Sequence, residues 1–139
     1  MIVGIGLDVC SIQRMEDALS RHGDRFWRRI LTERERAALA DRVDRGTALA
    51  GRWAAKEAIV KAMAGAPGVG WHDLEVLGGP REPPVMIVHG PARSLADRMG
   101  VRHIFLSITH DAGVAAAVVI LEAGEGPVAV DSPPSGGSP

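Results

Sequence analysis

The sequence contains little cysteine and almost no lysine. Each shortage limits the kinds of site and the cellular compartment that are possible. Cys10 is the only cysteine among 139 residues, so an intramolecular disulfide and a zinc cluster built on cysteine are both excluded. The expected compartment is therefore the reducing cytoplasm. Lysine occurs only as Lys56 and Lys61, and every other basic residue apart from histidine is arginine. Two lysines kept so close together indicate a place where a compact ammonium group is needed.

The sequence also lacks a long apolar run. The longest uninterrupted one, Val114 to Leu121, is far shorter than the roughly 20 residues of a membrane-spanning helix. The N-terminus has no basic region followed by an apolar stretch, as an export signal would. We therefore expect a cytoplasmic protein without a membrane partner. The net charge of -1 argues against a nucleic-acid partner, and the length suits one domain.

Charge is distributed unevenly along the chain. Between Ser11 and Arg52, ten arginines stand against seven acidic residues, which predicts an acidic or phosphorylated partner. Residues 123–139 are rich in glycine, proline and serine and have few large side chains to bury. We expect them to form a flexible tail after a domain of residues 1–122.

The most informative stretch runs from Arg52 to Gly65. It consists almost entirely of good helix formers, and Gly65 stands where a C′ glycine would end a helix. Glu57 and Lys61 are four residues apart and share a helix face surrounded by alanines. Their ordinary interpretation is a surface ion pair worth about 0.3–0.5 kcal/mol. The alternative is that a metal, a ligand or another backbone approaches them closely.

A further carboxylate, Asp8, lies near the end of a predicted strand, Ile2 to Val9. Alternation places Gly4 and Gly6 on the same face as Asp8, and glycines within a strand mark a bulge or a close approach. A dinucleotide fingerprint is disfavoured, because the third glycine is absent and the glycines lie inside the strand. Two carboxylates and a lysine without bulky neighbours are typical of a site for a divalent metal and phosphate.

The residue pattern of the N-terminal half of the sequence also predicts several helices. Ser11 can cap one that runs to about Arg21, and Asp24 can begin a second. Thr32 and Glu35 have capping-box spacing, which predicts a third helix from Glu33 to about Asp44. Arg45 and Gly46 are then expected to form a turn, and Thr47 to cap the long central helix.

After Trp71, apolar and polar residues alternate along the sequence, as they do in β-strands. The pattern predicts strands at Asp73–Leu77 and Val85–His89, a helix bracketed by Pro91 and Gly100, and a hairpin of Ile104–His110 and Val114–Leu121 around the turn Asp111–Gly113. His110 stands at the mouth of the hairpin, as a surface group or facing a site. Thr109 is expected on the strand face opposite to that of His110.

Three segments together resemble the short phosphopantetheinyl transferases of the holo-acyl-carrier-protein synthase type. They are residues 4–8 with Ile12 and Arg14, residues 52–58 with Lys61 and Ala62, and residues 106–110 with 115–117. The resemblance covers residues 1 to about 121 in order and spacing. It implies an α+β fold, with an antiparallel sheet wrapped on a long central helix, and a homotrimer whose active sites lie at subunit interfaces.

The resemblance also implies an activity: transfer of 4′-phosphopantetheine from coenzyme A to a serine of an acyl carrier protein, with release of adenosine 3′,5′-bisphosphate. Asp8 and Glu57 would hold Mg²⁺, Lys61 would neutralise phosphate charge, and Glu57, directly or through a metal-bound water, would act as the base. The coenzyme A contacts implied are Arg45, Arg52, Lys61, Gly65, Thr109 and His110, and those to the carrier protein are Arg14, Arg21, Arg25 and Arg28. Fatty-acid and polyketide carriers both remain open.

Two other functions are compatible with these residues. A non-catalytic module could bind an acidic helical carrier protein through the arginine face, which is the surface of Arg14, Arg21, Arg25 and Arg28. Glu57 and Lys61 would then be an ordinary ion pair. Another enzyme acting on a phosphate ligand is the third possibility. Coenzyme A binding that requires Mg²⁺ distinguishes the transferase from the binding module.

Overall fold

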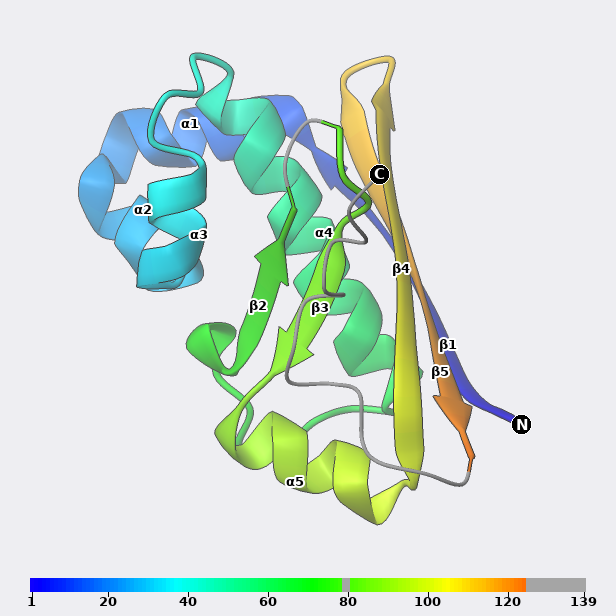
Figure 1. Cartoon of the computed structure of the whole chain (residues 1–139). Helices are drawn as coiled ribbons and strands as arrows, with labels where there is room; N and C mark the ends of the chain where they lie inside the picture. Colours follow the sequence, from blue (N-terminus) through cyan, green and yellow to red (C-terminus); the bar gives the residue numbers. More distant parts are fainter. Residues whose placement is uncertain (79–80, 125–139) are drawn as a thin grey trace.

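The computed structural model describes residues 1–78 and 81–124 and shows an α+β fold, as expected (Figure 1). The elements in chain order are β1 (Ile2–Ser11), α1 (Ile12–His22), α2 (Asp24–Ile30), α3 (Glu33–Ala38), α4 (Arg45–Ala62), the 3-10 turn η1 (Trp71–Asp73), β2 (Leu74–Leu77), β3 (Val85–Val88), α5 (Gly90–Arg98), β4 (Val101–Asp111) and β5 (Val114–Ala123). Residues 125–139 of the expected tail lie outside the described residues.

The long helix α4 forms the centre of the molecule. On one side lies an antiparallel sheet of order β1-β5-β4, and on the other lie α1 to α3 and the antiparallel pair β2-β3 (Figure 1). The inner face of β5 is fully buried, from Ala115 to Leu121 at every second residue. The expected sheet wrapped on a central helix is therefore confirmed. In the part of the chain that the structure describes, no helix combines the length and apolar character needed to cross a membrane.

The glycines of β1 allow the backbones of β1 and α4 to touch. A Cβ atom added at Gly6 would collide with the carbonyl oxygen of Ala58, and one at Gly4 would collide with that of Ala62. Ala58 and Ala62 are themselves buried. The close approach indicated by the sequence is therefore made by another backbone, and it brings Asp8 alongside the last turns of α4.

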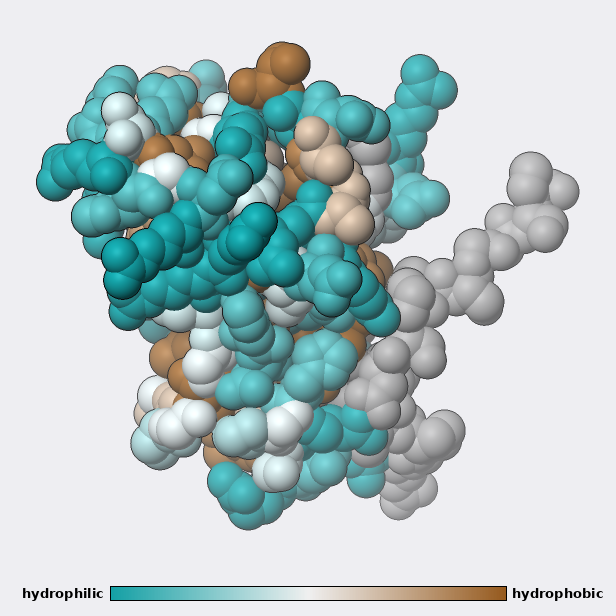
Figure 2. All heavy atoms as spheres, turned by 90° about the vertical axis from the view of Figure 1, so that its left-hand side faces the viewer, coloured by the Kyte–Doolittle hydropathy of each residue, from teal (hydrophilic) through white to brown (hydrophobic). Residues whose placement is uncertain are grey.

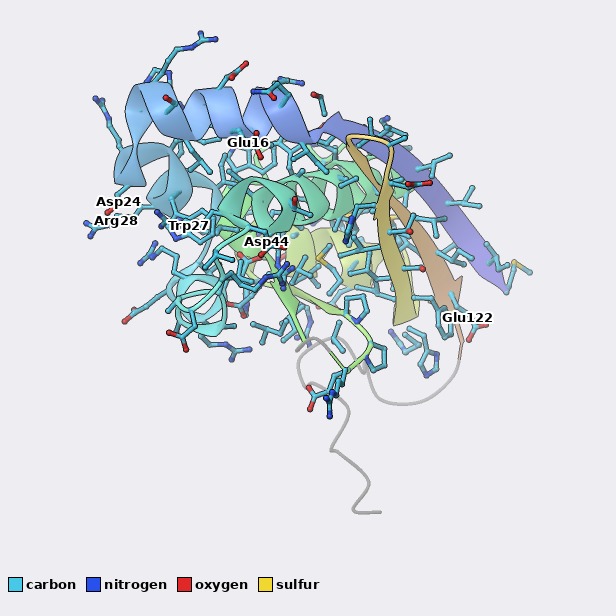
Figure 3. The ribbon with its side chains drawn as sticks, turned by 90° about the horizontal axis from the view of Figure 1, so that it is seen from above. Glu16, Asp24, Trp27, Arg28, Asp44 and Glu122 are labelled. Atoms are coloured by element: carbon cyan, nitrogen blue, oxygen red, sulfur yellow. The ribbon has the colours of Figure 1, made fainter. Side chains whose placement is uncertain are left out.

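The start of α4 differs from the expectation. The helix begins at Arg45 with Asp44 as its N-cap, and not after Thr47, so Gly46 lies inside the helix. A Cβ atom at Gly46 would collide with Cγ of Glu16, whose side chain points from α1 toward α4 in Figure 3. The glycine therefore serves close helix packing and does not form a turn. The third helix is also shorter than predicted, because α3 ends at Ala38 and not near Asp44.

Two turns also differ in detail. After α4, the positive φ begins at Ala64 (56°) and continues at Gly65 (90°), so Gly65 is the second left-handed residue and not the first. In the β4-β5 hairpin, Asp111 pairs with Val114, which leaves a two-residue turn in place of the expected three. The two turn residues, Ala112 and Gly113, have φ values of 52° and 81°, as a two-residue type I′ hairpin requires.

The other predicted helices, strands and caps are present, with different bounds for several strands. Asp73 belongs to η1 and not to β2, His89 follows β3, and β4 already begins at Val101. The Ser11 hydroxyl caps α1 by accepting a hydrogen bond from the Arg14 amide at 3.2 Å, and Thr32 and Glu35 form the predicted capping box. The strand β5 runs to Ala123, whose amide donates to the Met1 carbonyl at 2.8 Å.

The outer face of the three-stranded sheet is apolar and uncovered within the described chain. Ile5, Leu7 and Val9 of β1 are 66%, 61% and 59% exposed, and Phe105 of β4 is 51% exposed. Ile120 of β5 lies between Ile5 and Phe105 in the strand register, so the apolar row crosses all three strands. Figure 3 shows the side chains of β1 projecting away from the helices into open space. A contiguous apolar surface of this kind marks an interaction site.

Candidate active site

The contact between β1 and α4 brings a carboxylate and an ammonium group together. The Nζ atom of Lys61 donates hydrogen bonds to Asp8 Oδ1 and to the Leu7 carbonyl, both at 3.0 Å. Lys61 is therefore paired with Asp8 across the two elements, and of the two alternatives left open by the sequence, the ion pair with Glu57 along the helix is not formed. The reason is the glycine-mediated approach of β1, which places a carboxylate opposite Lys61.

Glu57 lies one helical turn before Lys61 and is half-buried. It lines a hollow of about 290 Å³ together with Val60, Gly70 and Trp71. Within residues 1–78 and 81–124, its carboxylate has no ion-pair partner. This side chain is therefore available to a ligand.

The thiol of Cys10 is buried near the start of α1 and feels the charges of both Asp8 and Glu57. Burial is the main cause that raises the pKa of Cys10 to about 11, and the negative charges of Asp8 and Glu57 raise it further, against Arg14. A thiol with so high a pKa stays protonated and is not a nucleophile at neutral pH. The buried Cys10 therefore has a structural role, as expected for a lone cysteine.

These two carboxylates form a donor set that fits Mg²⁺. Magnesium in enzymes is bound through one or two carboxylates, several waters and substrate phosphates. In the described part of the chain, no group of three or more histidine, cysteine or acidic side chains could hold a metal. A site built on Asp8 and Glu57 therefore needs water and phosphate oxygens to complete it, which suits a metal that binds together with its substrate.

A second site, of about 440 Å³, lies between α4 and the end of β4. Arg52, Thr109 and His110, all predicted as coenzyme A contacts, line it together with Thr47 and Gly51. Among the described residues, the buried Nε of Arg52 has no hydrogen-bond partner, and burial lowers the pKa of this guanidinium. A buried N–H donor without a partner is costly, and an anionic ligand would satisfy it.

Arg42 also lines this second hollow, although the sequence interpretation assigned it to a helix and overlooked it. Its guanidinium holds Asp44 through two hydrogen bonds of 2.6 and 2.7 Å. The other three predicted coenzyme A contacts lie elsewhere, and one of them is Lys61, which is bonded to Asp8. Arg45 packs over the ring of Trp27 at 4.3 Å and lies 3.5 Å from Asp24, and Gly65 is exposed beyond the opposite end of α4.

The arginine face contains a third hollow, of about 420 Å³. Of the four predicted carrier contacts, Arg14 and Arg25 line it, whereas Arg21 and Arg28 are exposed outside it. Arg29, which belongs to the same basic side of the helices, also lines it. The sequence interpretation did not place the other lining residues in a site; they are Met15, Ala18, His22, Phe26 and Trp53. Arg14 lies over the ring of Trp53 at 5.4 Å.

Figure 2, which views this helical side, shows hydrophobic groups surrounded by hydrophilic ones. The spacing of Arg25 and Arg29, one helical turn apart, was the available signal.

Comparison with known proteins identifies the family. Residues 4–119 match the family model described as the 4′-phosphopantetheinyl transferase superfamily. The chain belongs to this superfamily. Within it, the chain is 47% identical over 124 residues to a holo-[acyl-carrier-protein] synthase of Solidesulfovibrio magneticus, covering 88% of this chain and 99% of the relative. A synthase of the same name from Anaeromyxobacter is 45% identical over 130 residues, covering 91% and 100%.

Solved structures of phosphopantetheinyl transferases agree with the fold. A holo-(acyl-carrier-protein) synthase from Bacillus anthracis, described as in complex with CoA (3′,5′-ADP), is 38% identical with a TM-score of 0.71 and covers 89% of this chain and 99% of that one. The fold class and the assignment as an enzyme of the phosphopantetheinyl transferase family are thereby confirmed. The roles of individual residues remain predictions, which the three hollows now connect to defined places in the fold.

Proposed function

We propose that the enzyme transfers 4′-phosphopantetheine from coenzyme A to a serine of an apo acyl carrier protein, releases adenosine 3′,5′-bisphosphate and requires Mg²⁺. The observation that carries this proposal is the bond of Lys61 to Asp8 at the contact of β1 with α4, with Glu57 one helical turn before Lys61 on the same helix face, in a chain of this family. The curated relatives named above act, by name, on an acyl carrier protein.

The chemistry assigns each of the three side chains a task. The serine hydroxyl attacks the phosphorus of the pantetheine phosphate, a new O–P bond forms, and the pyrophosphate P–O bond to adenosine 3′,5′-bisphosphate breaks. Asp8 and Glu57 would hold Mg²⁺, which when bound would supply charge neutralisation for the pyrophosphate. Glu57 takes the serine proton as the general base. Lys61, released from or shared with Asp8, stabilises the charge that develops on the phosphate.

The pocket of Arg52 and His110 is proposed to bind the nucleotide of coenzyme A. A relative of the same family has been crystallised with this ligand. The orphaned Nε of Arg52 and the neighbouring Arg42 and His110 offer donors for phosphate oxygens. The arginine hollow of α1 and α2 is proposed to receive the acidic carrier protein, whose approach positive charge accelerates.

A direct experiment tests the reaction. The protein is incubated with coenzyme A, Mg²⁺ and an apo acyl carrier protein of fatty-acid synthesis, and the carrier is weighed by intact mass spectrometry. We expect a gain of one phosphopantetheine that disappears when EDTA removes the metal. If the folded protein modifies none of several fatty-acid and polyketide carriers, the transferase assignment for this chain is wrong, and the non-catalytic module described above becomes the better interpretation.

We also propose that the enzyme is a homotrimer with active sites at the subunit interfaces. The uncovered apolar face of β1, β5 and β4 supports association, because burying exposed apolar side chains is favourable. Asp8 and His110 lie on the two edge strands of this sheet, with β5 between them, so a neighbouring copy that docks at either edge would border one of the two proposed ligand sites.

The assembly is tested by a charge placed on the apolar face. Leu7→Glu should convert a trimeric mass, measured by light scattering after size exclusion, into that of a monomer, because association would bury the new carboxylate. Val43→Glu is the matched control, since Val43 is 99% exposed and lies in the loop before α4. A wild-type protein that is monomeric throughout the micromolar range would contradict the proposal.

A further inference from the structure

Lys56 is completely buried, although it is one of only two lysines in the chain. Its Nζ donates to Glu35 Oε1 at 2.6 Å, to the Ile30 carbonyl at 2.6 Å and to the Trp71 carbonyl at 3.1 Å. These three bonds use all the protons of the ammonium group. Burial lowers the pKa of Lys56, whereas the Glu35 carboxylate opposes this shift and favours the charged form.

The partner carboxylate extends the network to further segments. Glu35 accepts hydrogen bonds from the amide of Thr32 at 2.9 Å and from the amide of Val76 at 3.1 Å. One ion pair thus ties the end of α2, the start of α3, the turn η1 and the strand β2 to the central helix. A buried pair of this kind contributes little net stability compared with an apolar replacement, so its value lies in fixing geometry.

The geometry that Lys56 fixes lies between two of the hollows described above. The rings of Trp53 and Trp71 pack with their centroids 4.5 Å apart. Trp53 lines the arginine hollow, and Trp71 lines the hollow of Glu57. The two packed rings, one lining each hollow, therefore form a wall between the hollows, and Lys56 holds this wall through the Trp71 carbonyl.

We propose that Lys56 is a positioning residue, which holds the Trp53–Trp71 wall so that a carrier protein bound in the arginine hollow presents its serine to Glu57. This inference rests on the proposed transferase function and adds a route by which carrier binding is aligned with the chemistry. Lys56 itself touches neither substrate. Its loss affects the carrier side of the reaction, while the nucleotide pocket of Arg52 and His110 retains its own lining residues.

The test removes both buried charges together. A single Lys56 variant would leave Glu35 buried without a partner, so the double variant Lys56→Met with Glu35→Leu is used. We expect it to fold and to lose roughly 10- to 100-fold in kcat/KM for the carrier protein, because a displacement of about 1 Å has such an effect on transfer. Binding of adenosine 3′,5′-bisphosphate, measured by calorimetry, should change much less than transfer, because Glu35 acts on Arg52 through its charge but does not line the nucleotide pocket.

A second variant keeps the test decisive if the double variant does not fold. Trp71→Leu leaves the ion pair in place and removes half of the wall, so it should show the same selective loss, and Trp71→Phe should restore most of the rate. Wild-type carrier kinetics in Trp71→Leu or in the folded double variant would overturn the positioning role alone. An equal loss of nucleotide binding and of transfer would overturn it as well. A wild-type protein that transfers nothing would instead refute the proposed function, and the inference with it.

Discussion

Glu57→Gln should lower the turnover number by about 10²- to 10⁴-fold, the range over which a general base contributes to catalysis. The amide keeps the shape of the side chain but cannot accept the serine proton, and it is a weaker ligand for Mg²⁺ than a carboxylate. Because Glu57 is half-buried and makes no ion pair among the described residues, its neutralisation leaves no unpaired partner behind. The fold should therefore survive.

The measurement compares carrier modification rates across a Mg²⁺ titration, with circular dichroism as a check of folding. Glu33→Gln is the matched control, because it makes the same chemical change at an exposed residue in the first turn of α3. We expect its rate to stay close to that of wild type. A Glu57→Gln enzyme that works at the wild-type rate would show that neither the metal nor the base depends on this carboxylate.

The sequence allowed the main parts of the candidate site to be predicted because they follow from local patterns. Alternation in β1 placed Asp8 on the face of Gly4 and Gly6, and helical spacing placed Glu57 and Lys61 on one side of α4. The structure brings all three side chains to the contact of these two elements. For the packing of β1 against α4, the only sequence signal was the pair of glycines in β1, which predicts that another element approaches the strand closely.

Partners that are distant in the sequence were not predictable in this way. Helical spacing offered Lys61 a partner in Glu57, four residues away, as its ordinary interpretation, but the bond is made to Asp8, 53 residues away. The partner of Lys56 likewise comes from α3, 21 residues away, and nothing in helical periodicity distinguishes a buried lysine from an exposed one. Gly46 was mistaken for a turn residue because its reason for being glycine is the side chain of Glu16 on another helix.

Gly6→Ala should reduce the free energy of unfolding by about 1–3 kcal/mol, the usual effect of overpacking a close contact. The added methyl group would collide with the carbonyl oxygen of Ala58, which is helix backbone and cannot rotate away as a side chain does. Either β1 or α4 must shift. Since Asp8 and Lys61 bridge these two elements at 3.0 Å, the shift should also disturb the proposed metal and phosphate site.

The expected result is thus a double one: a lower midpoint in urea unfolding, and a transfer rate that falls even under conditions where the variant remains fully folded. Gly70→Ala is the matched control, because its φ is negative and a Cβ atom there would lie 3.6 Å from Asp73 Oδ2, an ordinary contact. It should unfold close to wild type. Wild-type stability in Gly6→Ala would mean that the backbones of β1 and α4 are farther apart than the structure shows. Lowered stability with an unchanged transfer rate would mean that the spacing of Asp8 and Lys61 is not what the chemistry depends on.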